Sequence, residues 1–178
     1  MDTPRLWTLI KDARSGQVPE QGAEAVAARA SVLLASWPRE DIVAVQQVLW
    51  DLMAFAYRSP LWGAAYVING GCSDDGFAYF RGWLIAQGRD TFERVVADPD
   101  VLADLPAVRT AAADGAVLEC EEMLHVAFTA YLAATGEQFP VETFTVRHPA
   151  LDPDWNFDFD DGAELARRLP RLAVLYPG

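Results

Sequence analysis

Apolar residues recur at helical spacing through the middle of the chain, and this periodicity constrains the fold more than any other feature. Between residues 38 and 57, Ile42, Val45, Leu49 and Met53 fall three or four residues apart. Residues at this spacing share one face of a helix, which must pack against a core. Further large apolar residues widen that face until little polar surface is left. The pattern predicts a central helix over residues 38–57.

Turn and capping residues predict a helical hairpin directly after this central helix. Two nearly apolar segments, residues 60–69 and 74–87, are separated by Gly70-Gly71, and glycine is favoured where a helix ends in a left-handed residue. Ser73 precedes the second segment, and a serine at this position caps a helix by accepting a first-turn N–H. We therefore expect two buried helices joined by a tight turn.

The remaining segments complete an all-α prediction: a single compact helical bundle with an irregular C-terminal extension. At 178 residues the chain fits one domain, residues 1–178. Residues 141–146 alternate as in a strand, but a single strand has no partner. Residues 141–178 are expected to form an acidic and aromatic extension with one short helix, at 163–169. The other predicted helices run from Asp2 or Thr3 to Ser15, from about Glu20 to Ala35, from Asp90 to Ala97, and over 116–135, with Val117, Cys120, Leu124, Phe128 and Tyr131 as its inner line.

Charge excludes two classes of partner. The formal net charge is −12, and affinity for phosphate backbones and anionic membrane surfaces depends on clustered Lys and Arg. We therefore expect no nucleic-acid or membrane partner, and instead a protein, including a basic toxin to be neutralised, or a small cationic ligand. Apolar runs are interrupted before about 18 residues, which predicts no membrane span, and the two cysteines are typical of reduced thiols in a cytoplasmic protein. Oligomeric state leaves no signal in the sequence.

The stretch from Trp62 to Gly88, WGAAYVINGGCSDDGFAYFRGWLIAQG, resembles a bacterial family catalogued as domain of unknown function 4240. Trp7, the segment from Phe92 to Asp104 and the LPRL at Leu169–Leu172 are also similar to that family. The resemblance spans most of the chain. It implies a standalone, intracellular, mainly helical bacterial domain, and it brings no substrate, cofactor or catalytic residue.

Cys72 is the first candidate for chemistry, because a helix N-terminus can activate a thiol placed just before it. Asp74 and Asp75 oppose this, since carboxylates beside a thiolate raise its pKa. The spacing of Cys72 and Cys120 gives no reason for a disulfide and leaves open whether they lie close together. Gly70-Gly71 lacks the lysine of a phosphate-binding loop, and Asp74 and Asp75 would repel a phosphate. The two aspartates are better suited to binding a cationic group.

Two metal patterns are incomplete. Glu121-Glu122-x-x-His125 matches one half of a di-iron site, but the second half is missing and both glutamates are expected to face solvent. The loop from Asp152 to Asp161 lacks the glycine and glutamate that an EF-hand requires. We therefore expect no metal and no cofactor, although calcium binding of another type by this loop stays open. Trp155, Phe157 and Phe159 are expected to attach the loop to the core.

Two functions follow from these candidates. The first is a non-catalytic binding or regulatory module that uses its acidic surface or the aromatic hairpin, with Trp62 and Tyr66 as contact residues. The alternative is an enzyme for a small molecule that uses a cleft near Cys72, Asp74, Asp75 and Arg81, with carboxylates as acid and base. An open cleft with a raised aspartate pKa would favour the enzyme, and a filled hairpin would favour the module.

Overall fold

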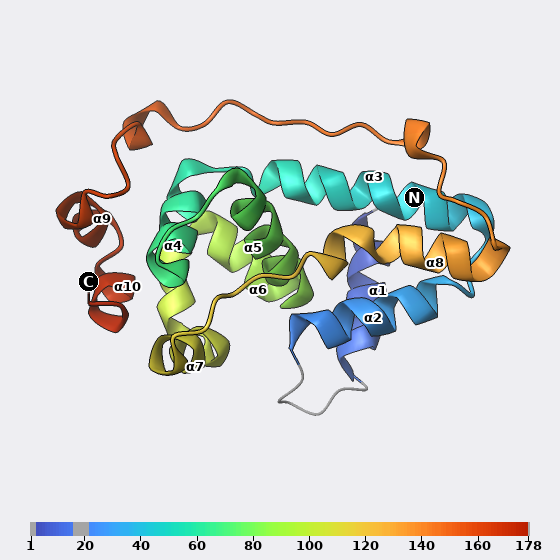
Figure 1. The fold of residues 1–178 in the computed structure, drawn as a ribbon, viewed down its shortest axis with the longest axis horizontal. Coiled ribbons are helices and arrows are strands. Elements are labelled where there is room, and N and C mark those ends of the chain that lie inside the picture. The colour runs from blue at the N-terminus through green and yellow to red at the C-terminus, as the bar shows by residue number, and fades with distance from the viewer. Residues whose placement is uncertain (1–2, 16–21, 178) are drawn as a thin grey trace.

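The apolar stripe predicted between residues 38 and 57 is the buried face of one helix, α3 (Arg39–Phe55). Four residues of this stripe, Ile42, Val45, Leu49 and Met53, are at most 1% exposed. α8 (Val126–Thr135) packs along α3, and α2 (Ala23–Leu34) packs on the other side of α8 (Figure 1). These three helices form one half of the molecule.

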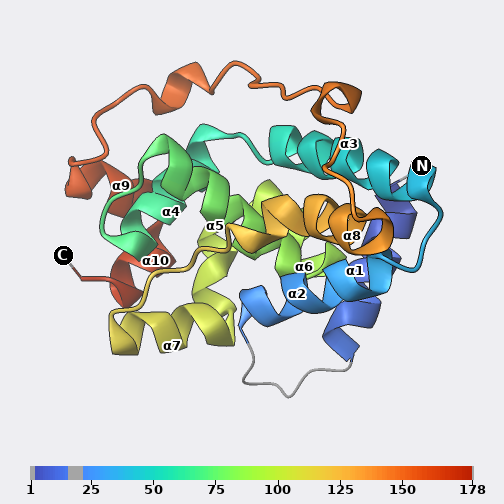
Figure 2. The ribbon, with the colours of Figure 1, turned by 45° about the vertical axis from the view of Figure 1, so that its right-hand side comes forward.

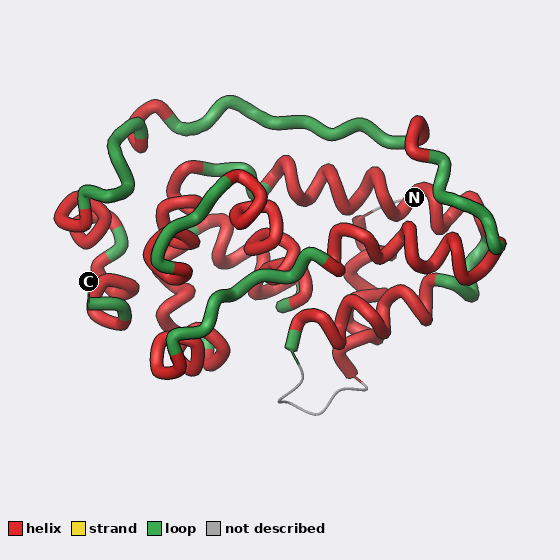
Figure 3. The backbone as a smooth tube through the Cα atoms, viewed as in Figure 1, coloured by secondary structure: helices red, strands yellow, loops and turns green. Residues whose placement is uncertain are grey.

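The computed structural model describes residues 3–15 and 22–177, and every regular element in these ranges is helical (Figure 3). The all-α prediction is confirmed, while the predicted helix starts at Asp2 and Glu20 lie outside the described residues. Residues 141–146 contain a single helical turn and extended chain rather than a strand. The other α-helices are α1 (Thr3–Ser15), α4 (Ser59–Asn69), α5 (Asp74–Ala86), α6 (Arg89–Ala97), α7 (Pro106–Asp114), α9 (Gly162–Arg168) and α10 (Pro170–Leu175), and the 3-10 helices are η1 (Pro99–Asp104), η2 (Glu122–His125), η3 (Val141–Thr143) and η4 (Pro153–Trp155). No helix in the described part of the chain combines the length and the apolar character needed to cross a bilayer.

The hairpin predicted from the glycine pair is formed by α4 and α5. Gly70 and Gly71 have φ values of +66° and +125°, in the region that side chains with a Cβ rarely adopt. The Ser73 hydroxyl accepts a hydrogen bond from the Gly76 N–H at 3.1 Å, as expected of an N-cap. Local sequence therefore determines where both helices stop and start. The next helix, α6, is capped by Gly88 rather than by Asp90, which lies in its first turn.

The long helix predicted over residues 116–135 is wrong in its first half. Gly115 ends α7 in a left-handed conformation, and the chain then runs extended to η2. The Asn69 side chain holds this extended segment by accepting from the Leu118 N–H at 2.9 Å and donating to the Leu118 carbonyl at 3.4 Å. The Cys120 N–H donates to the Tyr79 carbonyl at 2.9 Å. Val117, placed on the inner line of the predicted helix, is 59% exposed.

The C-terminal extension is anchored along the length of the molecule. Residues 139–161, which we call the strap, run along α3 toward α4, and α9 and α10 follow at the far end (Figures 1 and 2). The extension therefore holds two short α-helices, not the predicted one, because Pro170 opens a second helix directly after the first. α10 packs on η1 and α4. The buried carboxylate of Asp100 accepts from the N–H groups of Arg171 and Leu172 at 3.0–3.1 Å.

Candidate functional site

The residues proposed from sequence lie around the α4–α5 hairpin but do not line an open cleft. Asp74 and Asp75 are exposed in the first turn of α5, and Cys72 is half-buried in the preceding turn. The Trp62 ring stacks on Phe77 with a centroid distance of 4.7 Å and an interplanar angle of 14°. The Trp62 indole N–H also donates to the Cys72 carbonyl at 3.0 Å. Aromatic packing therefore fills the space between the two helices.

Arg81 is buried, with 3% of its surface exposed, so it does not face solvent beside the aspartates. Its guanidinium donates to the Met53 carbonyl at 2.7 Å and to the Phe77 carbonyl at 3.1 Å. It also lies over the rings of Phe77 and Tyr57, at 4.5 and 5.0 Å, where the ring faces attract a cation. Burial lowers the pKa of Arg81 to about 10. Arg81 thus joins α5 to the end of α3 as a charged structural residue.

The two cysteines are free thiols with raised pKa values. Burial is the main cause of the Cys72 pKa of about 12; Glu119 and Asp74 raise it further, and Arg81 lowers it. Burial also raises the pKa of Cys120 to about 12. The thiolate is the nucleophilic form of cysteine, and with these pKa values the protonated thiol is the main form of both side chains at neutral pH. Asp74 raises the Cys72 pKa, as expected from the sequence, but burial has the larger effect.

The aromatic face of α4 is covered by the strap. Phe159 meets the Tyr66 ring edge-on at 5.7 Å, and the Tyr66 hydroxyl donates to the Asp160 carboxylate, which raises the Tyr66 pKa. A Cβ at Gly63 would lie 2.9 Å from the Trp155 ring, so the small residue lets the strap approach closely. Trp62 and Tyr66 are therefore half-buried by contacts within the chain, and their role as contact residues stays a prediction.

The metal candidates do not gather into a ligand cluster. Glu121, Glu122 and His125 are exposed beside a shallow pocket of about 260 Å³ formed with α2. No group of three or more His, Cys, Asp or Glu side chains in the described residues is arranged to hold a metal ion, and this includes the loop from Asp152 to Asp161. As predicted, the two glutamates face solvent. Calcium binding of another type by this loop stays the open alternative that the sequence left.

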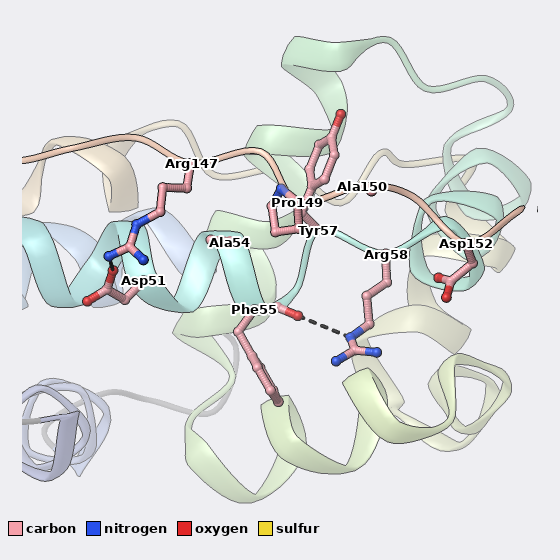
Figure 4. Close-up of a pocket in the computed structure, with 9 residues that line it drawn as sticks. All are labelled: Asp51, Ala54, Phe55, Tyr57, Arg58, Arg147, Pro149, Ala150 and Asp152. Carbon is pink, nitrogen blue, oxygen red and sulfur yellow. Dashed lines mark hydrogen bonds and ion pairs between the residues drawn. The ribbon is translucent and has the colours of Figure 1, made fainter.

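A groove that the sequence did not reveal lies where the strap passes the end of α3 (Figure 4). It has a volume of about 590 Å³. On one wall Arg147 of the strap pairs with Asp51 of α3 at 3.4 Å. On the other, Arg58 donates to the Phe55 carbonyl at 3.2 Å and makes no ion pair with any described residue. The groove joins residues about ninety-six positions apart in sequence, as in the Asp51–Arg147 pair, so local patterns could not predict it.

Two further cavities lie beyond Phe55, a residue that is 52% exposed. An apolar pocket of about 330 Å³ is lined by Phe55 and by Trp7 and Phe92 among others. It shares Pro4, Trp7 and Arg89 with a larger cavity of about 810 Å³ between α1 and the start of α6. The apolar pocket also shares Phe55 with the groove, so the three hollows form a series with this pocket in the middle. None of them is lined by the hairpin candidates from the sequence.

Comparison with known proteins gives a family but no activity. A family model described as "Protein of unknown function (DUF4240)" matches residues 1–133. No curated protein and no solved structure matches the chain. The matched residues include α1 to α7 and most of α8, and the strap, α9 and α10 follow the match.

Proposed function

The chain belongs to the DUF4240 family, which has no characterised activity, and we propose that it is a non-catalytic binding or regulatory module. Its binding surface is the series of adjoining hollows that passes Phe55. One observation carries this proposal: Phe55 lines both the groove and the apolar pocket, and Trp7 lines both that pocket and the largest cavity. Concave surfaces with apolar walls and a few polar groups are where ligands bind.

The packing of the hairpin supports a module over an enzyme. An enzyme at Cys72 would need an ionised thiol or an open carboxylate site. Instead the pKa of Cys72 is about 12, and the guanidinium of Arg81 is bound to two backbone carbonyls. The charged neighbours that act most on Cys72 include the carboxylates of Glu119 and Asp74, which favour the protonated thiol over the thiolate. The enzyme alternative therefore has less support than the module.

Phe55 is the residue that the proposal makes central. It is a large apolar side chain more than half exposed at the end of α3, and Arg58 lies over its ring at 5.4 Å. Aromatic side chains, phenylalanine included, and arginine are enriched at protein–protein interfaces relative to the rest of the surface. The earlier expectation of a protein or a small cationic ligand at Asp74 and Asp75 stays a prediction from charge alone.

Ligand-induced thermal shifts test the module against the enzyme. Small molecules are screened for those that raise the Tm of the wild-type protein, since a ligand of the folded state must stabilise it. The hits are then measured on Phe55→Ala and on Cys72→Ala. We expect the shift to be lost in Phe55→Ala and kept in Cys72→Ala. Val174→Ala, which removes another exposed apolar side chain (83% exposed) from α10, serves as the matched control and should keep the shift.

The reverse pattern would contradict the proposal. If hits bind Phe55→Ala as well as wild type but lose affinity in Cys72→Ala or Asp74→Asn, the ligand sits at the hairpin. Turnover of a hit by wild type and its loss in Asp74→Asn would then favour the enzyme.

A further inference from the structure

The largest of the three adjoining cavities, at about 810 Å³, has a basic lining. Lys11 and Arg14 come from α1 and Arg89 from the start of α6; Asp90 is the one carboxylate among the lining residues. The whole chain has 14 Lys and Arg against 26 Asp and Glu, and Lys11 is its single lysine. An excess of cations at one cavity therefore reverses the sign of the molecule locally.

Two of these cations have no carboxylate partner among the described residues. Lys11 forms no ion pair there, and Arg14 donates one N–H to the Ala86 carbonyl at 2.6 Å while its other N–H groups have no such bond. Arg89 pairs with Glu93 at 2.7 Å in an exposed pair on its own helix, which contributes little energy. The positive charge in the cavity is thus largely free to act on a ligand.

The backbone at the start of α6 adds donors of the same sign. Gly88 is the N-cap, with a φ of +88°, and it has no side chain to accept the first-turn N–H groups. These N–H groups and the positive end of the helix dipole favour an anion. The Arg14 side chain lies 3.7 Å from the Cβ position of Gly88, so the cation and the helix start face the same space.

The overall charge of −12 does not cancel this arrangement. Exposed charges are screened over about 8 Å at physiological salt, so an anion inside the cavity interacts chiefly with the charged groups that line it, three cations (Lys11, Arg14 and Arg89) and one carboxylate (Asp90). The distant carboxylates slow the approach of an anion more than they weaken its final contacts.

The adjoining apolar pocket indicates what the anion is attached to. It shares Pro4, Trp7 and Arg89 with the basic cavity and continues to Phe55 and Phe92. We propose that this pair of cavities binds a small molecule with an anionic head, in the basic cavity, and a flat apolar portion, in the aromatic pocket. The inference rests on the proposed function and specifies its ligand class. Phosphate and carboxylate heads share the required chemistry.

Isothermal titration calorimetry with defined probes tests the inference. The probes are 1-naphthyl phosphate, 1-naphthoate, inorganic phosphate and 1-naphthalenemethanol, which present head and ring together or separately. We expect the two joined probes to bind more tightly than the free phosphate or the uncharged ring. The order of 1-naphthyl phosphate and 1-naphthoate then distinguishes a phosphate from a carboxylate head.

Three variants separate the contribution of the basic cavity to binding from that of the aromatic pocket. Lys11→Gln should weaken 1-naphthyl phosphate about tenfold, the usual loss when a bond to a charged group is removed. Phe55→Ala should weaken it roughly fivefold through lost apolar contact, without changing the affinity for inorganic phosphate. Arg94→Gln is the control: it removes a charge from α6 outside the cavity lining. It should change the affinity for neither 1-naphthyl phosphate nor inorganic phosphate.

Failure of this inference can be distinguished from failure of the proposed binding function. No binding of either joined probe to wild type, or equal affinity for Lys11→Gln and wild type, overturns the inference. If Phe55→Ala no longer binds the screened ligands while Lys11→Gln still binds them, the series of hollows binds a ligand without an anionic head. Only the assignment of an anionic head then fails. If neither variant affects any ligand, both proposals fail.

Discussion

Replacing Gly82 with alanine tests how closely residues 116–121 pack against α5. Glycine inside a helix costs about 1 kcal/mol relative to alanine, so Gly82→Ala would stabilise an ordinary helix. Gly82 is buried in α5, and a Cβ built there would lie only 2.4 Å from the Cys120 carbonyl oxygen. That atom is backbone and cannot rotate away.

The expected magnitude follows from what must move. Forcing a methyl group into a packed site costs about 1–3 kcal/mol. Displacing Cys120 also weakens its hydrogen bond to Tyr79 and strains the pairing of Asn69 with Leu118, and each bond contributes about 1 kcal/mol. These costs exceed the helix-propensity gain, so we expect a net loss of about 1–3 kcal/mol. For a chain of this length the Tm falls by about 2–4 °C per kcal/mol.

Urea denaturation followed by far-ultraviolet circular dichroism gives the free energy of unfolding. Gly162→Ala is the matched control, because it changes a helical glycine whose Cβ would meet nothing within 4 Å. The control should be neutral or slightly stabilised. A Gly82→Ala protein as stable as wild type or more stable would refute the reasoning, and with it the extended path of residues 116–121.

Two further predictions concern the end of the chain and the thiol. Asp100→Ala leaves the first N–H groups of α10 without their buried acceptor; we expect a loss of about 1–3 kcal/mol and faster proteolysis after α9, and unchanged proteolysis would contradict this role. Because burial raises the Cys72 pKa from 9.0 to about 12, the folded state holds this proton more tightly. Its contribution to stability is therefore complete below pH 9 and is lost as pH rises from about 9 to about 12. Iodoacetamide should label native Cys72 much more slowly than the urea-unfolded chain at pH 8, and equal rates would show that the thiol is accessible and ionised.

Local signals predicted the elements that depend on neighbouring residues. The stripe of α3 and the Gly70 stop are set within a few positions of sequence, as is the Ser73 cap, so periodicity and turn chemistry were sufficient. The helix over 116–121 was predicted because Val117, Cys120 and Leu124 fit the same period. The Asn69 amide, 49 residues away, binds the backbone of Leu118 instead, and tertiary contact overrides the local preference.

The candidate site depended on contacts that no local pattern contains. Sequence reasoning grouped Cys72, Asp74, Asp75 and Arg81 because they are close in the chain. In a helix, however, Arg81 lies about two turns beyond the aspartates, and it turns inward to the Met53 carbonyl. The basic cavity joins Arg14 to the end of α5, 72 residues away. The one sign of this basic cavity in the sequence was Lys11, the single lysine of an acidic chain.

The strap also determines when the fold can be completed during synthesis. Its bonds to the body join residues separated by 93 to 98 positions, such as Asp152 with Ser59 and Thr145 with Gln47. Contacts this distant in sequence form late, because the intervening chain must be ordered first. Until residues near 160 have left the ribosome, Tyr66 cannot make its contacts with Phe159 and Asp160. The outer face of α4 is exposed to solvent during this time. The nascent chain therefore passes through a stage with an exposed aromatic surface on α4, which the strap then covers.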